Sequence, residues 1–271
     1  MSDRLVIENL QVSYRGHGQH VQAVAPMSLA VPAGQKLGIV GESGSGKSTL
    51  LKAVLGLIRP PGVVRADGIW LDGTDLRSLS RREFRSRCGS EIAMIFQDPV
   101  NALNPAFSIR DQFRRSFRLH QPELPRSRYT ETMLRALASV GIDGRDKLGR
   151  YPFEFSQGQL QRIMIALACS SPRLKVLLAD EPTSSLDVTT QAQVLDLLHA
   201  LQAELGFSLV IVTHNLPVVA ELCDRALVMC RGEVVEDTDV IALFEQPAHD
   251  YTRHLLASMA ALPQSVDGAT P

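Results

Sequence analysis

The sequence predicts an α/β fold in which a mostly parallel β-sheet is combined with helices and interrupted by a helical insertion. Short apolar segments suited to buried strands alternate along the chain with segments of helical periodicity. A glycine-rich loop follows one of these strands and opens a helix. Between residues 98 and 154 the strand-like segments give way to helical patterns rich in arginine. We therefore expect this middle segment to be inserted into the α/β core.

Length, composition and charge limit the class of protein. The 271 residues suffice for one large domain or a core with a smaller insertion, and 45% of them are hydrophobic. The 28 basic and 29 acidic residues give a net charge of −1, which predicts no nucleic-acid partner. No apolar run approaches the ~20 residues of a membrane span, and no signal pattern opens the chain. A membrane role is therefore expected only through a partner.

Cysteine and histidine positions argue against a metal or cluster site. No CxxC pair occurs, and the scattered thiols are expected to be reduced: Cys88, Cys169, Cys223 and Cys230. His17 and His20 lie in a glycine-rich turn, which is more typical of an exposed loop than of a metal site.

The elements of the first half follow from local patterns. Strands are expected where apolar side chains alternate or run continuously, at residues 5–8, 27–31, 36–40, 68–73 and 92–96. The run at 36–40 ends in glycines and suits a buried strand. Residues 47–57 have helical spacing and stop at Pro60 and Pro61.

Two helices are expected in the insertion, at 109–119 and 128–140, separated by Pro122 and Pro125. Strand–helix alternation then resumes, with elements at 174–179, 188–205, 208–213 and 216–223 and a hairpin formed by 226–230 and 233–236. The polar tail at 264–271 is expected to be frayed.

The most specific local motif is a phosphate-binding loop between the strand at 36–40 and the following helix. It consists of Gly41, Glu42, Ser43, Gly44, Ser45, Gly46, Lys47, Ser48 and Thr49. Glycines allow backbone N–H groups to wrap around phosphates, and the helix directs its positive end at the same anion. Lys47 supplies charge at the β and γ phosphates, and the Ser48 hydroxyl suits Mg²⁺. The alternative interpretation is a glycine-rich turn with a chance lysine.

Two carboxylates, Asp180 and Glu181, follow the apolar strand at 174–179. The carboxyl ends of strands are where open α/β sheets bind ligands. Asp180 suits a second-shell or water-mediated contact with Mg²⁺, and Glu181 suits a base that polarises the attacking water. Alone, the pair also fits a solvated acidic turn after a core strand.

With both motifs in place, residues 5–256 resemble the nucleotide-binding subunits of ABC transporters. Further motifs carry the resemblance: Tyr14 as the adenine-stacking aromatic, Gln97 as the Q-loop, residues 155–159 as the signature, residues 184–187 as the D-loop and His214 as the switch histidine. The implied fold is a P-loop NTPase (RecA-like) core with an antiparallel β subdomain and an inserted α-helical subdomain. The implied domains are a core at 1–97 and 156–240, a helical subdomain at 98–155, and C-terminal helices with a tail at 241–271.

The resemblance implies ATP and Mg²⁺ as ligands and assigns roles. Tyr14 stacks on the base unless it is an ordinary strand aromatic, and residues 41–49 hold the phosphates. Ser48, Gln97 and Asp180 serve the metal. The catalytic residues are Glu181, Gln97 and His214. Glu181 acts as the base, and His214 bridges the γ-phosphate to a partner subunit. Alternatively, His214 is only the residue at the start of a helix.

The signature also implies that two cassettes sandwich ATP. Ser156, Gly158 and Gln159, with Asp187 of the D-loop, would serve a nucleotide bound across the interface, helped by the positive start of a helix at 159–169. The family's signature has two glycines after its serine, whereas Gln157 precedes the single glycine here. This departure raises the alternative of a cassette that binds ATP and hydrolyses it poorly.

Other segments are similar to the peptide and nickel importer group: residues 92–99, 101–105, 151–154, 160–162 and 246–253. That group implies a second, different ATP-binding subunit, two transmembrane permease subunits and an extracytoplasmic substrate-binding protein. It places the chain peripherally on the cytoplasmic face of the cell membrane. The cargo is left open between peptides on one side and nickel or metallophores on the other. Some oligopeptide members carry a longer C-terminal extension, so the shorter chain here favours nickel or metallophores. The alternative is a non-transport ATPase, such as one serving phosphonate C–P bond cleavage.

A permease helix is expected to dock in a groove formed by residues 98–118 and the rest of the insertion. Phe107, Phe113 and Phe117 are candidate contacts there, although ordinary core packing explains them equally well.

Overall fold

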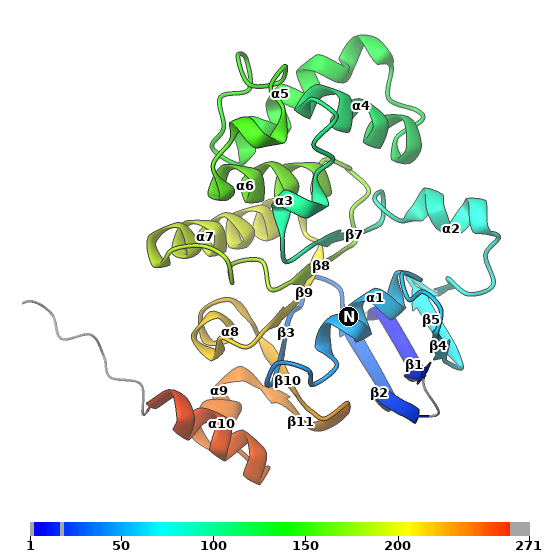
Figure 1. Ribbon diagram of the computed structural model, residues 1–271, viewed down its shortest axis with the longest axis vertical. Coiled ribbons are helices and arrows are strands. Elements are labelled where there is room, and N and C mark those ends of the chain that lie inside the picture. The colour runs from blue at the N-terminus through cyan, green and yellow to red at the C-terminus, as the bar shows by residue number, and fades with distance from the viewer. Residues whose placement is uncertain (1–2, 17–18, 261–271) are drawn as a thin grey trace, which may run out of the picture.

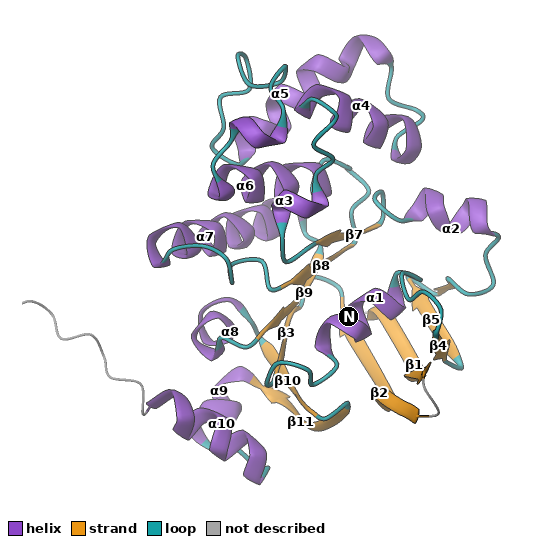
Figure 2. Ribbon diagram, viewed as in Figure 1, coloured by secondary structure: helices purple, strands orange, loops and turns teal. Residues whose placement is uncertain are grey.

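The computed structural model describes residues 3–16 and 19–260, and it contains two β-sheets surrounded by helices (Figures 1 and 2). The expectations for His17, for the His20 side chain and for the tail at 264–271 lie outside the described residues. None of the helices within the described ranges has the length and hydrophobicity needed to cross a bilayer.

The larger sheet has six strands in the order β11-β10-β3-β9-β8-β7. Its members are β3 (Lys36–Val40), β7 (Ile92–Ile95), β8 (Val176–Asp180), β9 (Ser208–Thr213), β10 (Arg225–Cys230) and β11 (Glu233–Asp239). All neighbours pair in parallel except β10 and β11, which form the hairpin at one edge. The mostly parallel sheet predicted from the sequence is thus present.

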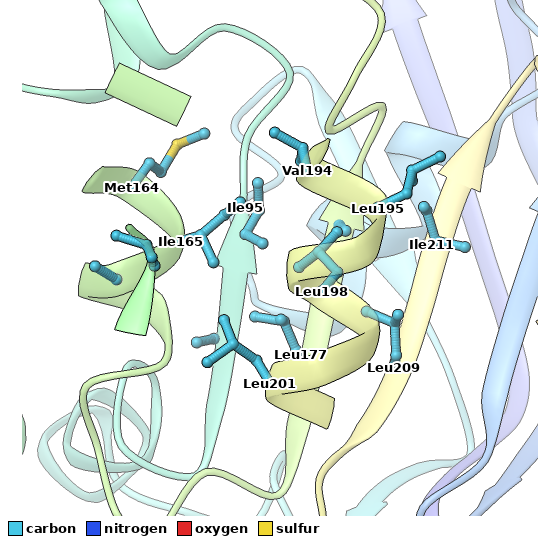
Figure 3. Packing of buried hydrophobic residues seen from close by; sticks show 14 of the residues in the cluster. Ile95, Met164, Ile165, Leu177, Val194, Leu195, Leu198, Leu201, Leu209 and Ile211 are labelled. Atoms are coloured by element: carbon cyan, nitrogen blue, oxygen red, sulfur yellow. The ribbon is translucent and has the colours of Figure 1, made fainter. Parts of the chain in front are cut away.

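Both faces of this sheet are buried, which explains why its strands are continuously apolar. Along β8, Leu177 and Ala179 join a hydrophobic cluster on one face, whereas Val176 and Leu178 join the cluster on the other. Helices α6 (Gln157–Ala168) and α7 (Val188–Leu205) contribute to the first cluster, as do α8 (Leu216–Leu222) and α9 (Val240–Glu245). Figure 3 shows Ile165 of α6 beside Ile95 of β7.

The second face is covered by α1 (Lys47–Val54) and by an antiparallel sheet. That sheet contains β1 (Asp3–Gly16), β2 (Gln19–Pro32), β4 (Gly62–Arg65), β5 (Gly68–Leu71) and β6 (Thr74–Asp75). The strands predicted at 5–8 and 27–31 are much shorter than the observed β1 and β2. The reason is that register shifts between β1 and β2 interrupt the alternation of side chains. The predicted helix at 47–57 ends earlier, at Val54.

The segment of residues 99–168, between β7 and β8, is helical and lies at the top of Figure 1. Its helices are α3 (Pro99–Ala102), α4 (Ile109–His120), α5 (Tyr129–Ser139) and α6, with short 3₁₀ turns at Arg126–Arg128 and Pro152–Glu154. The signature helix begins at Gln157 rather than at 159, because Ser156 caps it.

Of the two interpretations of Phe113 and Phe117, core packing is the correct one, and partner contact is excluded by their burial. Both rings are fully buried, 5.8 Å apart between centroids, and Phe117 packs edge-on against Tyr129. They hold α4 against α5. Only Phe107 stays partly accessible, with the Arg115 guanidinium 3.7 Å above its ring.

Two further helices complete the described chain. Helix α2 (Arg81–Arg87) was not predicted, because none of its side chains is fully buried and Phe84 is its single apolar residue, which gives no hydrophobic periodicity. It is defined instead by a capping box between Ser80 and Glu83. Helix α10 (Asp250–Ala260) follows α9 at the edge of the molecule near β11 (Figure 1).

Replacing Phe113 with alanine is expected to lower the free energy of unfolding by about 3–5 kcal/mol, because a fully buried ring leaves a cavity. Urea denaturation of the full chain measures the loss. The matched change Phe107→Ala is expected to cost only about 1 kcal/mol. Equal losses in the two variants would contradict the assignment of Phe113 to the core.

Candidate functional site

The loop between β3 and α1 is pressed between the two sheets. Gly41 has φ 151°, and a Cβ there would lie 2.1 Å from the Met229 carbonyl oxygen of β10. Gly46 has φ 101°, and a Cβ there would lie 2.3 Å from the Ala23 carbonyl oxygen of β2. The Gly232 N–H donates to the Ser45 carbonyl at 3.0 Å. Only glycine fits at both contacts, since each opposing atom is backbone.

Lys47 is the first residue of α1, and its side chain curls back over this loop. It is only 4% exposed, and its Nζ donates to the carbonyls of Gly41 and Glu42, both at 2.7 Å, and to the Ser45 hydroxyl at 3.2 Å. Burial lowers the pKa of Lys47, while the carboxylates of Glu181 and Asp180 oppose that shift. The ammonium is thereby held where an anionic phosphate entering the loop would meet it.

Ser48 links this loop to the end of β8. Its hydroxyl donates to Asp180 Oδ1 at 2.6 Å. Burial raises the pKa of Asp180, and the hydrogen bond from Ser48 opposes the shift. A hydroxyl and a carboxylate are the hard oxygen ligands that suit Mg²⁺. The described residues contain no group of three or more His, Cys, Asp or Glu side chains able to hold a metal, so water and phosphate oxygens would have to complete the coordination.

Glu181 and His214 meet at the carboxyl ends of neighbouring strands. Strand β8 pairs with β9, and the Glu181 N–H continues this ladder by donating to the Val212 carbonyl at 2.8 Å. Glu181 Oε2 lies 3.0 Å from His214 Nδ1. The Glu181 backbone has φ 46°, an unfavourable value for a residue with a Cβ, and it persists because the ladder fixes it. The strained turn directs a carboxylate out of the sheet edge.

Gln97 lies two residues beyond β7, the strand next to β8. Its side chain is exposed and makes no hydrogen bond among the described residues. Gln97 therefore follows the strand next to β8, but no hydrogen bond within the described residues joins its side chain to Ser48 or Asp180.

The signature residues form a separate group at the start of α6. The Gln159 N–H donates to the Ser156 hydroxyl at 3.3 Å, and the Ser156 N–H donates to Gln159 Oε1 at 3.2 Å. A Cβ on Gly158 would lie 2.9 Å from Thr190 Cγ2 at the start of α7. Gln157 is exposed and takes part in the helix, so its backbone does not require glycine.

Asp187 caps α7 beside this group. It accepts hydrogen bonds from the Thr190 N–H at 2.9 Å and from the Thr190 hydroxyl at 2.7 Å, and these bonds lower its pKa. No hydrogen bond within the described residues joins the starts of α6 and α7 to Lys47, Ser48 or Glu181. These residues therefore form two separate groups, which we call the first half-site, the phosphate-binding loop with its carboxylates, and the second half-site, the paired helix starts.

Tyr14 lies half-buried on β1, opposite Gly62 of β4. A Cβ at Gly62 would lie 2.7 Å from Tyr14 Cε1, so the glycine makes room for the ring. The sequence analysis missed Tyr251 on α10, whose hydroxyl accepts a hydrogen bond from the Glu42 N–H at 3.0 Å. The two residues are 209 positions apart in the sequence, so no local signal could have found this contact.

The loop wrapped around Lys47 and its link to a carboxylate at the end of a parallel strand define a P-loop nucleoside-triphosphate hydrolase. A family model described as ABC transporter matches residues 24–184. The chain belongs to the ABC transporter family, as the resemblance of its motifs predicted.

Two relatives and one solved structure illustrate this membership. The glutathione import ATP-binding protein GsiA of Pectobacterium atrosepticum is 44% identical over 263 residues, 94% of this chain but only 42% of GsiA. The dipeptide transport ATP-binding protein DppD of Escherichia coli K12 is 41% identical over 261 residues, 96% of this chain and 79% of DppD. Dimeric MJ0796, a bacterial ABC transporter cassette, has a TM-score of 0.75 at 26% identity and covers 87% of this chain and 98% of its own. The predicted fold class and ATP-hydrolysing activity are confirmed.

Replacing Gly158 with alanine is expected to destabilise the chain by about 1–3 kcal/mol, because the new methyl group meets Thr190 Cγ2. Thermal and urea denaturation measure the effect. Thr190→Ser removes that methyl but keeps the capping hydroxyl, so it is expected to restore stability in the double variant. Gln157→Ala, one residue earlier on an exposed position, serves as the control and is expected to change stability by less than about 0.5 kcal/mol. Failure of Thr190→Ser to rescue would refute the proposed contact.

Proposed function

We propose that this chain binds and hydrolyses ATP to drive the uptake of short peptides through a membrane permease. The observation that supports hydrolysis most directly is the meeting of two pairs at one sheet edge, Ser48 with Asp180 and Glu181 with His214. Peptides are favoured as cargo because the relatives are named for glutathione, dipeptide and oligopeptide transport. Nickel or metallophore uptake and phosphonate cleavage have no such support.

In this proposal the residues of the first half-site divide the work. Residues 41–49 hold the phosphates, and Lys47 exchanges its loop carbonyls for phosphate oxygens. Ser48 and Asp180, together with Gln97, would hold Mg²⁺, and the ion would neutralise phosphate charge. Glu181 accepts a proton from the attacking water, His214 orients the γ-phosphate, and Tyr14 stacks on the base.

The second half-site serves a second cassette, which we propose to be a different chain. Ser156 and Gly158 are accessible at the start of α6, where N–H groups and the helix dipole favour an anion. ATP held by one subunit is sandwiched against Ser156, Gly158 and Gln159 of the other, with Asp187 beside them. Because Gln157 leaves the capped helix start intact, we expect hydrolysis rather than binding alone.

The permease docks on an apolar groove of about 460 Å³ between the core and the insertion. Leu57 and Phe96 line it from the core, together with Met164 and Leu167 of α6. Leu103 lines it from the insertion. Leu57 is 46% and Phe96 38% exposed, values high for large apolar side chains. Two permease subunits and an extracytoplasmic substrate-binding protein complete the transporter, and the chain sits peripherally at the cytoplasmic face of the cell membrane.

The proposed domains follow these tasks. The core at 1–97 and 156–240 carries the phosphate-binding half-site. The insertion at 98–155 carries part of the groove, and the segment from 241 onward supplies the C-terminal helices.

Lys47→Ala and Glu181→Gln are each expected to abolish peptide uptake in cells that lack the native gene, because one removes the phosphate cation and the other the base. Loss of a general base costs at least about 100-fold in turnover. Uptake of a radiolabelled dipeptide measures the effect. Glu221→Gln, at an exposed position on α8, makes the same chemical change away from the site and is expected to leave uptake intact.

Normal uptake with Glu181→Gln would refute hydrolysis at this site as the power source. Total cellular nickel, measured in the same strains by elemental analysis, tests the cargo. If Lys47→Ala lowers cellular nickel and leaves dipeptide uptake unchanged, the cargo is a metal rather than a peptide. The ATPase assignment is not affected by that result.

Leu57→Glu is expected to prevent co-purification of the permease, because it places a charge in the apolar groove at a cost of several kcal/mol. The matched variant Ile241→Glu changes a residue 67% exposed on α9, outside the groove, and is expected to leave co-purification unchanged. Retention of the permease by Leu57→Glu would show that the groove is not the docking surface.

A further inference from the structure

Helix α10 reaches the phosphate-binding loop through one hydrogen bond. The Glu42 N–H donates to the Tyr251 hydroxyl at 3.0 Å. Glu42, Ser43 and Gly44 form the exposed stretch of the loop. Among the hydrogen bonds of the described residues, only the one to Tyr251 joins this stretch to a residue outside the loop and α1. The other anchors of the loop, at Gly41, Ser45 and Gly46, lie to either side.

Glu236 on β11 fixes the position of Tyr251 by holding the two residues that precede α10. The two carboxylate oxygens of Glu236 accept hydrogen bonds from the N–H groups of Ala248 and His249, at 2.9 and 3.0 Å. Glu236 is only 9% exposed, and Thr252, next to Tyr251, is fully buried. These contacts hold the start of α10 against the sheet edge. The chain of contacts runs from β11 through α10 to the loop.

The chemistry of the contact suits a permanent anchor. Burial raises the pKa of Tyr251, although the bond from the Glu42 N–H opposes this shift, so the phenol stays neutral at physiological pH. A neutral phenol accepts the hydrogen bond from the Glu42 N–H without adding negative charge beside a phosphate site. Removing its oxygen leaves the Glu42 N–H without this partner and loosens the exposed stretch of the loop.

We infer that Tyr251 is a positioning residue for the phosphate-binding loop, and that helix α10 thereby sets the affinity of the chain for ATP. The inference rests on the proposed nucleotide site. A loop already held in its binding conformation loses less conformational freedom when phosphates arrive, so the hydrogen bond strengthens binding without touching the nucleotide. A purely structural contact would instead stabilise α10 and leave nucleotide affinity unchanged.

Tyr251→Phe removes only the hydroxyl. We expect the full chain with this change to bind a fluorescent ATP analogue about two- to tenfold more weakly in equilibrium titration with Mg²⁺, the range for loss of one hydrogen bond. In the assembled transporter the KM for ATP is expected to rise by a similar factor, with kcat at saturating ATP changed less than about twofold. Tyr129→Phe is the matched control, since the Tyr129 hydroxyl makes no hydrogen bond within the described residues; its affinity is expected to be that of wild type.

A second variant tests the route through α10. Glu236→Gln keeps one acceptor oxygen but weakens the anchor of Ala248 and His249, and it is expected to lower ATP affinity. In the Tyr251→Phe background it is expected to have no further effect on affinity, because the contact it supports is already gone.

Each outcome decides between the two roles. An unchanged Kd in Tyr251→Phe, with or without a lower Tm, overturns the positioning role. Additive effects of the two changes on Kd overturn transmission through Tyr251. ATP binding that is unaffected by Lys47→Ala overturns the nucleotide site itself, and this result is distinguishable from failure of the positioning role alone.

Discussion

The close approach of backbone to backbone around the loop at 41–46 is the constraint on which the rest of the structure depends. The carbonyls of Met229 and Ala23 come so near Gly41 and Gly46 that no side chain fits between them. The loop therefore joins the parallel sheet to the antiparallel one, and α1 emerges between them with its apolar side chains in the shared core. A tight loop of this kind keeps its N–H groups in place before any anion arrives, which lowers the entropic cost of binding.

The order of the parallel strands brings the other chemical groups to this loop. Because β9 lies between β3 and β8, the segments that follow these three strands emerge side by side. Ser48 can then reach Asp180, and Glu181 can reach His214, although more than 30 residues separate the members of each pair. The same order leaves the starts of α6 and α7 without a bond to the loop. In the proposed assembly, a second subunit supplies what each half-site lacks.

The sequence predicted those features that depend on local patterns. Helix α7 and strand β9 have the bounds expected from periodicity, since each presents a continuous or periodic apolar face to the core. Helix α2 was missed because it has no such face, and β1 and β2 were predicted too short because their register shifts break the alternation. Phe113 and Phe117 illustrate a different limit, because apolar residues at helical spacing look the same whether they meet a partner or their own core. The Tyr251 contact depends on tertiary packing alone.

Helix α6 gives the proposed function a mechanical basis. Its first turn carries Ser156 and Gly158, and Met164 and Leu167, further along the same helix, line the groove. Twelve residues of α-helix extend about 18 Å and bend little, so a displacement at the groove is carried to the signature end. The opposite wall of the groove includes Phe96, the neighbour of Gln97. In the proposed transporter, a permease helix that moves in this groove would therefore act on both half-sites at once. It would act through α6 on the partner's nucleotide and through the end of β7 on this chain's own nucleotide.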